Sequence, residues 1–306
     1  MARLIRASWR RTPSYWHAEF LSAVSKARLF VLNRQHIDGS FSRLSADEPV
    51  ETRLKETYHA IASLQLSSQS VTAEESVRFL RGNIGISNDM LSVYYRIGAL
   101  HSLVGLGGIS LADYGLVSEM EAADICYDDA RVFSRSLRQA CMYAETRSRL
   151  DISVRYAREI RRLVYLSEHA ERGFGFSPNI VDTEYFVRLC QACGARAGSR
   201  GIYRFLGAIQ RPYFGFSPLD QLGTSLGVIC SGLVCCRLLG AQVIHADDIV
   251  QYILQTQRED GCFADSADDQ GSMQDTHRAL YALALLLGGT AFPANSPQVG
   301  LQLSFP

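Results

Sequence analysis

Two kinds of helix alternate along the chain, judged by where the hydrophobic side chains fall. Residues 16–32 carry a single apolar stripe that includes Phe20, and residues 151–166 repeat this pattern. A one-sided stripe is typical of a helix with one face in water. Residues 226–234 and 279–287 are apolar on all sides instead, as expected of enclosed helices. Because strand-like alternation is weak throughout, the pattern predicts an all-α protein with an outer and an inner layer of helices.

A turn that contains Gly and Phe recurs between an outer and an inner helix, and each inner helix is expected to begin near a Thr. The turn glycines, spaced by 46, 90, 40 and 46 residues, are Gly39, Gly85, Gly175, Gly215 and Gly261. The expected threonines are Thr57, Thr183, Thr224 and Thr276. Since 90 is about twice the other spacings, a further unit is predicted near residues 128–133. Six helical hairpins can close into a ring, so we predict an (α/α)6 toroid around a central apolar cavity.

The 306 residues are predicted to form one toroid domain. We expect residues 1–15 to be an arginine-rich tip and residues 289–306 to be a tail, each either wrapping around the domain or disordered. With 31 basic and 31 acidic residues the net charge is zero, which argues against nucleic acid as the main partner. The longest apolar run, residues 226–236, is too short to span a bilayer, and cysteines lie in apolar stretches. We therefore expect a cytoplasmic protein without a transmembrane segment.

The repeats resemble the terpenoid cyclase and protein prenyltransferase superfamily across nearly the whole chain. The most similar unit is the last one, residues 253–265 followed by Asp275-Thr-His-Arg-Ala-Leu-Tyr, which looks like the final repeat of a prenyltransferase β-subunit. This resemblance implies a barrel around an aromatic-lined funnel that takes an isoprenoid as its small-molecule substrate. It defines the fold more sharply than the chemistry, because the superfamily contains several mechanisms.

Zinc-dependent prenyl transfer is one mechanism that the resemblance implies. It would need Asp and Cys at the start of one inner helix and His at the start of the next. Residues 222–227 have no Cys in register, and Thr276 stands at or beside the family's His, with His277 one position away. We therefore expect no zinc. A prenyltransferase-like chain would also need a helical protein partner.

Protonation by a buried carboxylic acid is the second mechanism, and the cyclases carry it on an Asp-x-Asp-Asp-Thr motif. The nearest matches end in Asp182-Thr183 and Asp275-Thr276, with one acid each. Desolvation in an apolar cavity raises the pKa of a single Asp, so Asp182 and Asp275 are the candidate catalytic acids. The alternative for both, and for Glu56 before Thr57, is helix capping.

Aromatic and charged residues in or near the inner helices are candidates for substrate binding. Ring faces stabilise carbocations and contact a prenyl chain, and arginines bind a diphosphate with paired hydrogen bonds. The candidates are Tyr58, His59, Asp89, Tyr94, Tyr95, Tyr185, Arg188, His277 and Arg278. Core packing and pairing with neighbouring carboxylates are the alternatives. No cofactor is required, although Mg²⁺ would accompany a diphosphate substrate.

Taken together, the residues favour an enzyme that cyclises an isoprenoid to a terpenoid or meroterpenoid by protonation. A relative of the prenyltransferase β-subunits, or a toroid that binds isoprenoids without chemistry, are the alternatives.

Overall fold

The computed structural model describes residues 14–67, 73–86, 89–107, 115–122, 133–154, 168–169, 173–174, 179–195, 197, 200–219, 223–265 and 269–286. Most of the expected N-terminal tip, the tail 289–306, Gly175 and residues 128–132 lie outside this part of the chain.

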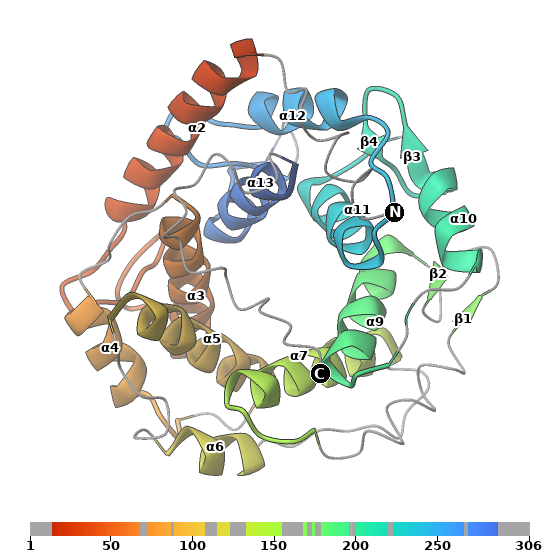
Figure 1. The fold of residues 1–306 in the computed structure, drawn as a ribbon. Helices are drawn as coiled ribbons and strands as arrows, with labels where there is room; N and C mark the ends of the chain where they lie inside the picture. Colours follow the sequence, from red (N-terminus) through yellow and green to blue (C-terminus); the bar gives the residue numbers. More distant parts are fainter. Residues whose placement is uncertain are drawn as a thin grey trace.

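In the described part of the chain, six helices stand side by side around a central axis (Figure 1). Each packs against the next one in the chain, and the last packs against the first, so the ring is closed. These inner helices are α3 (Val50–Leu66), α5 (Met90–Gly107), α7 (Phe133–Arg149), α9 (Ile180–Ala192), α11 (Leu226–Leu239) and α13 (Met273–Leu286). The predicted all-α toroid is confirmed, and the unit expected near residues 128–133 supplies α7.

The outer helices lie around this ring (Figure 1). They are α2 (Ser14–Leu32), α4 (Ala73–Gly82), α6 (Leu116–Ala122), α10 (Arg200–Ile209) and α12 (Ala246–Gln255). On α2 the apolar stripe faces inward, because Phe20 and Val31 are buried whereas Leu29 is 55% exposed. Of the outer helix expected over residues 151–166, only residues 151–154 are described, and they are not helical. None of the helices in the described ranges is long and apolar enough to cross a membrane.

Short antiparallel pairings close the turns between outer and inner helices. β1 (Glu168–His169) pairs with β2 (Gly173–Phe174), and β3 (Gln210–Arg211) pairs with β4 (Gly215–Phe216). Single bridges join Gln35 to Phe41 and Gln257 to Phe263 in the same way. In β2 the glycine is Gly173, with a left-handed φ of 87°. It begins the first of two tandem Gly-Phe pairs in the sequence; the predicted turn glycine, Gly175, lies outside the described residues.

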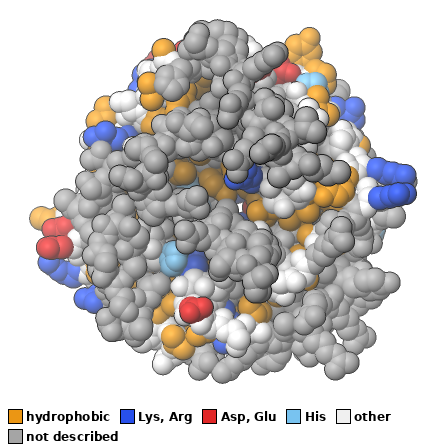
Figure 2. Space-filling model, in the orientation of Figure 1, with side chains coloured by type: hydrophobic (Ala, Val, Ile, Leu, Met, Phe, Trp, Pro, Cys, Tyr) orange, Lys and Arg blue, Asp and Glu red, His pale blue; other side chains and the backbone are white. Residues whose placement is uncertain are grey.

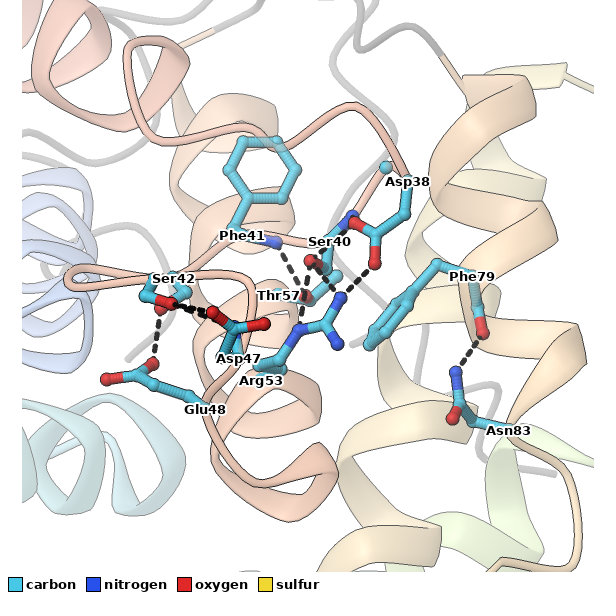
Figure 3. A network of polar contacts seen from close by, with 12 residues as sticks. Asp38, Ser40, Phe41, Ser42, Asp47, Glu48, Arg53, Thr57, Phe79 and Asn83 are labelled. Atoms are coloured by element: carbon cyan, nitrogen blue, oxygen red, sulfur yellow. Dashed lines mark hydrogen bonds and ion pairs between the residues drawn. The ribbon is translucent and has the colours of Figure 1, made fainter.

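A backbone hydrogen bond ties the Phe of the turn to the Thr of the inner helix in three units. The N–H of Phe41, Phe174 and Phe263 donates to the hydroxyl of Thr57, Thr183 and Thr276, at 3.0, 3.0 and 3.1 Å. Figure 3 shows the first of these bonds, beside Arg53 bound to Asp38 and Ser40. The fourth expected Thr is different, because α11 begins after the N-cap Ser225 and Thr224 therefore precedes the helix.

Candidate functional site inside the ring

Asp182, the first predicted acid, caps a helix. It is the third residue of α9, and its N–H donates to the side-chain oxygen of the N-cap Asn179 over 2.8 Å. In return, the Asn179 amide donates to Asp182 Oδ2 over 3.1 Å. This reciprocal pairing satisfies free groups at the helix start, and Asp182 is only 5% exposed.

Asp275 makes the corresponding contacts on α13. Its N–H donates to Ser272 Oγ over 3.0 Å, and the Ser272 hydroxyl donates to Asp275 Oδ2 over 2.6 Å. Arg278 Nη1 lies 3.3 Å from the other carboxylate oxygen. Burial raises the pKa of Asp275, while the Ser272 hydroxyl and Arg278 act in the opposite direction. The geometry thus favours the capping interpretation for both predicted acids.

Asp89 directly precedes α5, whereas Glu56 lies within α3. Asp89 is a helix cap, because its Oδ2 accepts the N–H of Ser92 over 3.2 Å. Glu56 is not a cap, since α3 begins earlier, at Val50. Glu56 Oε2 is buried and has no hydrogen-bond partner in the described part of the chain, and burial raises the pKa of this carboxyl. The capping expectation for Glu56 is therefore wrong.

Six ring side chains gather where α3, α5 and α13 face one another. Neighbouring ring centroids are 5.1–6.1 Å apart. We call this group the aromatic–histidine cluster; its members are Tyr58, His59, Tyr94, Tyr95, His277 and Tyr281. The structure thus brings together five predicted substrate-binding residues and adds Tyr281, which sequence reasoning missed although it follows His277 by one helical turn.

The cluster lies on the inner side of the ring. Tyr94 on α5 contacts Arg188 of α9, which is not a neighbouring helix. Tyr94 and Tyr95 are 4% and 6% exposed, whereas Tyr58 and His277 are only partly buried. Figure 2 shows hydrophobic and basic side chains toward the middle of this face. The inner side of the ring therefore carries aromatic and charged side chains as well as aliphatic ones.

His59 and His277 touch each other within the cluster, with their Nδ1 atoms 3.0 Å apart. Burial, with smaller contributions from Arg278 and Arg188, lowers the pKa of His277 to about 4. Burial also holds the pKa of His59 well below its usual value, with His277 and Lys55 adding to the effect. Both imidazoles are therefore neutral at pH 7.

Arg188 joins two carboxylates on the opposite side of the ring. Its Nε and Nη2 donate to Glu145 over 2.7 and 2.5 Å, and its Nη1 donates to Glu184 over 2.8 Å. Ser231 donates to the second oxygen of Glu184 over 2.6 Å. Burial pushes the pKa of Glu145 upward, but Arg188 outweighs it and the pKa is lowered overall. Arg188 therefore pairs with carboxylates, and Tyr185 lies beside it, with its ring centre 6.0 Å from the guanidinium.

Two arginines of α7, which sequence reasoning missed, bring guanidinium groups to the cluster. Arg138 Nη2 donates to the Tyr95 hydroxyl over 3.2 Å, and Arg149 Nη2 donates to the Tyr94 hydroxyl over 3.4 Å. The Arg149 guanidinium lies 4.8 Å from the Tyr94 ring centre. Arg138 Nε and Arg149 Nη1 are buried and have no hydrogen-bond partner among the described residues.

Gly98 of α5 marks in the sequence the place where Arg149 and Tyr58 approach this helix closely. A Cβ at this position would lie 2.7 Å from Tyr58 Cε2 and 2.9 Å from Arg149 Nη1. Glycine costs about 1 kcal/mol in a helix interior relative to alanine, so its presence indicates that space is needed here.

The residues inside the ring do not fit the zinc site of the prenyltransferases. Where that site would lie, the N-cap of α11 is Ser225 and the Nδ1 of His277 is engaged by His59. Burial raises the pKa of the Cys230 thiol to about 12, so this side chain is not a thiolate. Over the described ranges, no group of three or more His, Cys, Asp or Glu side chains is placed to hold a metal ion.

The closed ring of helical hairpins and its aromatic interior define an α/α toroid protein. A family model, the prenyltransferase alpha-alpha toroid domain, matches residues 9–83 and 138–299, which is more than half of the chain. The chain therefore belongs to the prenyltransferase alpha-alpha toroid domain family. A comparison with curated proteins found no match. The family assignment confirms the resemblance seen in the repeats; it does not distinguish cyclisation from prenyl transfer.

Proposed function

We propose that the ring binds an isoprenoid diphosphate and converts it through a carbocation. The observation that carries this proposal is a pair of buried guanidinium nitrogens, on Arg138 and Arg149, next to the aromatic–histidine cluster; within the described ranges neither nitrogen has a hydrogen-bond partner. An unpaired buried donor on a cation is costly, and an anionic ligand would satisfy it. Arg188 and Arg278 contribute less, because carboxylates already pair with them.

The prenyl chain would lie against the cluster. Tyrosine rings offer apolar area to an acyclic hydrocarbon and negative ring faces to a carbocation. When the carbon–oxygen bond to the diphosphate breaks, its electron pair leaves with the diphosphate, and the two α7 arginines would stabilise that developing charge. Mg²⁺, where it takes part, would arrive with the diphosphate.

Binding of farnesyl diphosphate tests this arrangement. We expect Arg149→Gln and Arg138→Gln each to weaken its binding by about tenfold or more, since each removes a charge-assisted hydrogen bond. Binding of farnesol, which has the same chain without the diphosphate, should change little. Calorimetric titration of both ligands measures the two affinities.

Arg237→Gln is the matched control, because Arg237 is an exposed arginine in the last turn of α11. It should leave both affinities unchanged. Equal losses for farnesol and farnesyl diphosphate in the α7 variants, with melting temperatures unchanged, would refute the placement of the diphosphate.

A second candidate function is protonation-initiated cyclisation with Asp275 as the acid. It is favoured because burial raises the pKa of the Asp275 carboxyl. Asp275→Asn would then abolish cyclised products from an isoprenoid that lacks a diphosphate, such as squalene, as followed by gas chromatography. Asp182→Asn, in the other capping pair, is the comparison, and equal product yields from both variants and the parent would eliminate this candidate.

A further inference from the structure

We infer that His59 is the proton acceptor that ends the carbocation reaction, and that His277 holds it in the required tautomer. This inference rests on the proposed function for its substrate, but the state of the two imidazoles is a property of the chain itself. Four observations carry it: the short contact between the rings, the unpartnered second nitrogen of His59, its position, and the cationic surroundings.

The contact requires one shared proton. Two Nδ1 atoms 3.0 Å apart form a hydrogen bond only if one carries hydrogen and the other offers its lone pair. Because both imidazoles are neutral at pH 7, the two residues must be opposite tautomers. The proton therefore lies on Nδ1 of one histidine and on Nε2 of the other.

The surroundings of His59 Nε2 decide which histidine is the donor. This nitrogen is buried and has no hydrogen-bond partner among the residues that the structure describes, and the residue is only 7% exposed. A buried N–H without an acceptor is rarer and more costly in proteins than an acceptor without a donor. His59 is therefore the tautomer that donates from Nδ1 to His277, and its Nε2 carries a free lone pair.

That lone pair lies inside the ring rather than in the outer layer. His59 contacts Tyr95 on α5 at a centroid distance of 5.7 Å and His277 on α13 at 5.2 Å. These helices flank α3 on both sides, and Tyr95 in turn reaches Arg138 of α7. His59 thus stands within the aromatic–histidine cluster, where a prenyl chain would lie.

Four cations act on the imidazole pair: Lys55 on α3, Arg138 on α7, Arg188 on α9 and Arg278 on α13. The rings of Tyr58, Tyr95 and Tyr281 contact the pair. Among the described residues, the groups that contribute most to the lowered pKa values of His59 and His277 include no carboxylate. The pair therefore remains an unprotonated base at neutral pH.

The chemical step is the loss of one proton from the carbocation. A C–H bond adjacent to the cationic carbon breaks, its electron pair forms a carbon–carbon double bond, and the proton goes to His59 Nε2. The imidazolium that forms shares its Nδ1 proton with His277, which spreads the charge over two rings. His59 is the catalytic residue in this step, and His277 is a positioning residue.

The tautomers are directly measurable. Long-range ¹H–¹⁵N spectra of the full-length protein labelled with ¹⁵N-histidine distinguish a protonated Nδ1 from a protonated Nε2, and a His59→Asn sample assigns the signal among the seven histidines. At pH 7.5 we expect His59 to carry its proton on Nδ1. A proton on Nε2, or on both nitrogens, would overturn the inference whatever the substrate is.

Two variants of His277 separate positioning from simple packing. Asn at position 277 can accept the His59 Nδ1 proton, so His277→Asn should preserve the tautomer. His277→Leu offers no acceptor and should shift most of the His59 population to the Nε2 tautomer. An unchanged His59 tautomer in His277→Leu would show that His277 does not position it.

A pair of cationic ligands tests the lone pair itself. Protonated N,N-dimethylfarnesylamine has one N–H to donate, whereas N,N,N-trimethylfarnesylammonium has none. The parent protein should bind the first about tenfold more tightly, and His59→Asn should abolish that preference. Binding of both without preference in the parent would contradict the inference. Failure of both to bind would contradict the proposed function instead, and the tautomer measurement would still decide the inference.

Discussion

At the scale of single residues, Arg188 pairs with two carboxylates inside the ring, Glu145 of α7 and Glu184 of α9. The side chains of Arg188, Glu145 and Glu184 are 23%, 19% and 12% exposed. Removing one partner from a buried ion pair leaves a charge without compensation, which costs more than the pair contributes. Arg188 is therefore better understood as the ion-pair partner of two buried carboxylates than as a diphosphate ligand.

We expect Arg188→Met to destabilise the protein by about 3–5 kcal/mol at pH 8. In the parent, the pKa of Glu145 is lowered on folding, so its stabilising contribution is complete above the unfolded pKa of about 4.3 and is lost as the pH falls through the folded pKa. In the variant, Glu145 loses the Arg188 contribution that lowers its pKa, so burial raises the pKa of this carboxyl. The loss should therefore be smaller at pH 5.

Urea unfolding of both proteins at pH 8 and pH 5 measures this difference. Arg237→Met removes an exposed arginine and should cost less than about 0.5 kcal/mol at either pH. A destabilisation in Arg188→Met that stays constant with pH would mean that neither carboxylate depends on Arg188.

At the scale of single elements, the turn between an outer and an inner helix is held by a Thr hydroxyl. In α9, Thr183 accepts the N–H of Phe174 and donates to the carbonyl of Asn179 over 2.7 Å. In α9, Thr183 stands four residues after the N-cap Asn179. The same position in α11, four residues after the N-cap Ser225, is Ile229, which has no hydroxyl to make this bond. The predicted start of an inner helix near a Thr is confirmed for Thr183 in α9 and Thr276 in α13. It is wrong for Thr57, since α3 begins earlier, at Val50, and in α11 the cap is Ser225 rather than Thr224.

Thr183→Val should destabilise the protein by about 1–3 kcal/mol, because valine fills the same volume but leaves the Phe174 N–H buried without an acceptor. Thr224→Val is the matched control, since Thr224 is only partly buried and precedes its helix. It should cost less than about 0.5 kcal/mol. Guanidinium unfolding measures both, and equal costs at the two sites would contradict this account of the turns.

At the scale of the whole molecule, four glycines in the turns lie against the next outer helix, namely Gly39, Gly173, Gly215 and Gly261. A Cβ on Gly39 would overlap Glu75 of α4, one on Gly173 would overlap Phe205 of α10, and one on Gly215 would overlap Ile249 of α12. The last, Gly261, lies against the backbone carbonyl of Lys26 on α2. The turn before α13 thus packs on the first outer helix and closes the outer layer, as α13 and α3 close the inner one.

Gly261→Ala should therefore weaken the closure of the ring. Its φ of 92° disfavours a side chain, and the new Cβ would collide with the α2 backbone, so we expect a loss of about 2–5 kcal/mol. Gly240→Ala is the control: its φ is 67°, but open space surrounds it, and it should cost about 1–2 kcal/mol. Differential scanning calorimetry compares the two, and a smaller loss at Gly261 would contradict its role in closure.

The sequence by itself determined the repeat, the number of hairpins and the order of the layers. Glycine and threonine recur because each turn imposes the same local backbone requirement, and local requirements are visible in a sequence. The same holds for Glu184 and Arg188, which are four residues apart on one helix and so could be paired from spacing alone.

Only the tertiary structure decided what the ring interior contains. An inner helix is enclosed on all sides, so its hydrophobic pattern does not reveal which side faces the centre. Arg138 and Arg149 become candidate ligands because they reach Tyr95 and Tyr94 on another helix, and His59 becomes a base because His277 meets it from the far end of the chain. These contacts arise from ring closure, which brings distant segments together without any local signal.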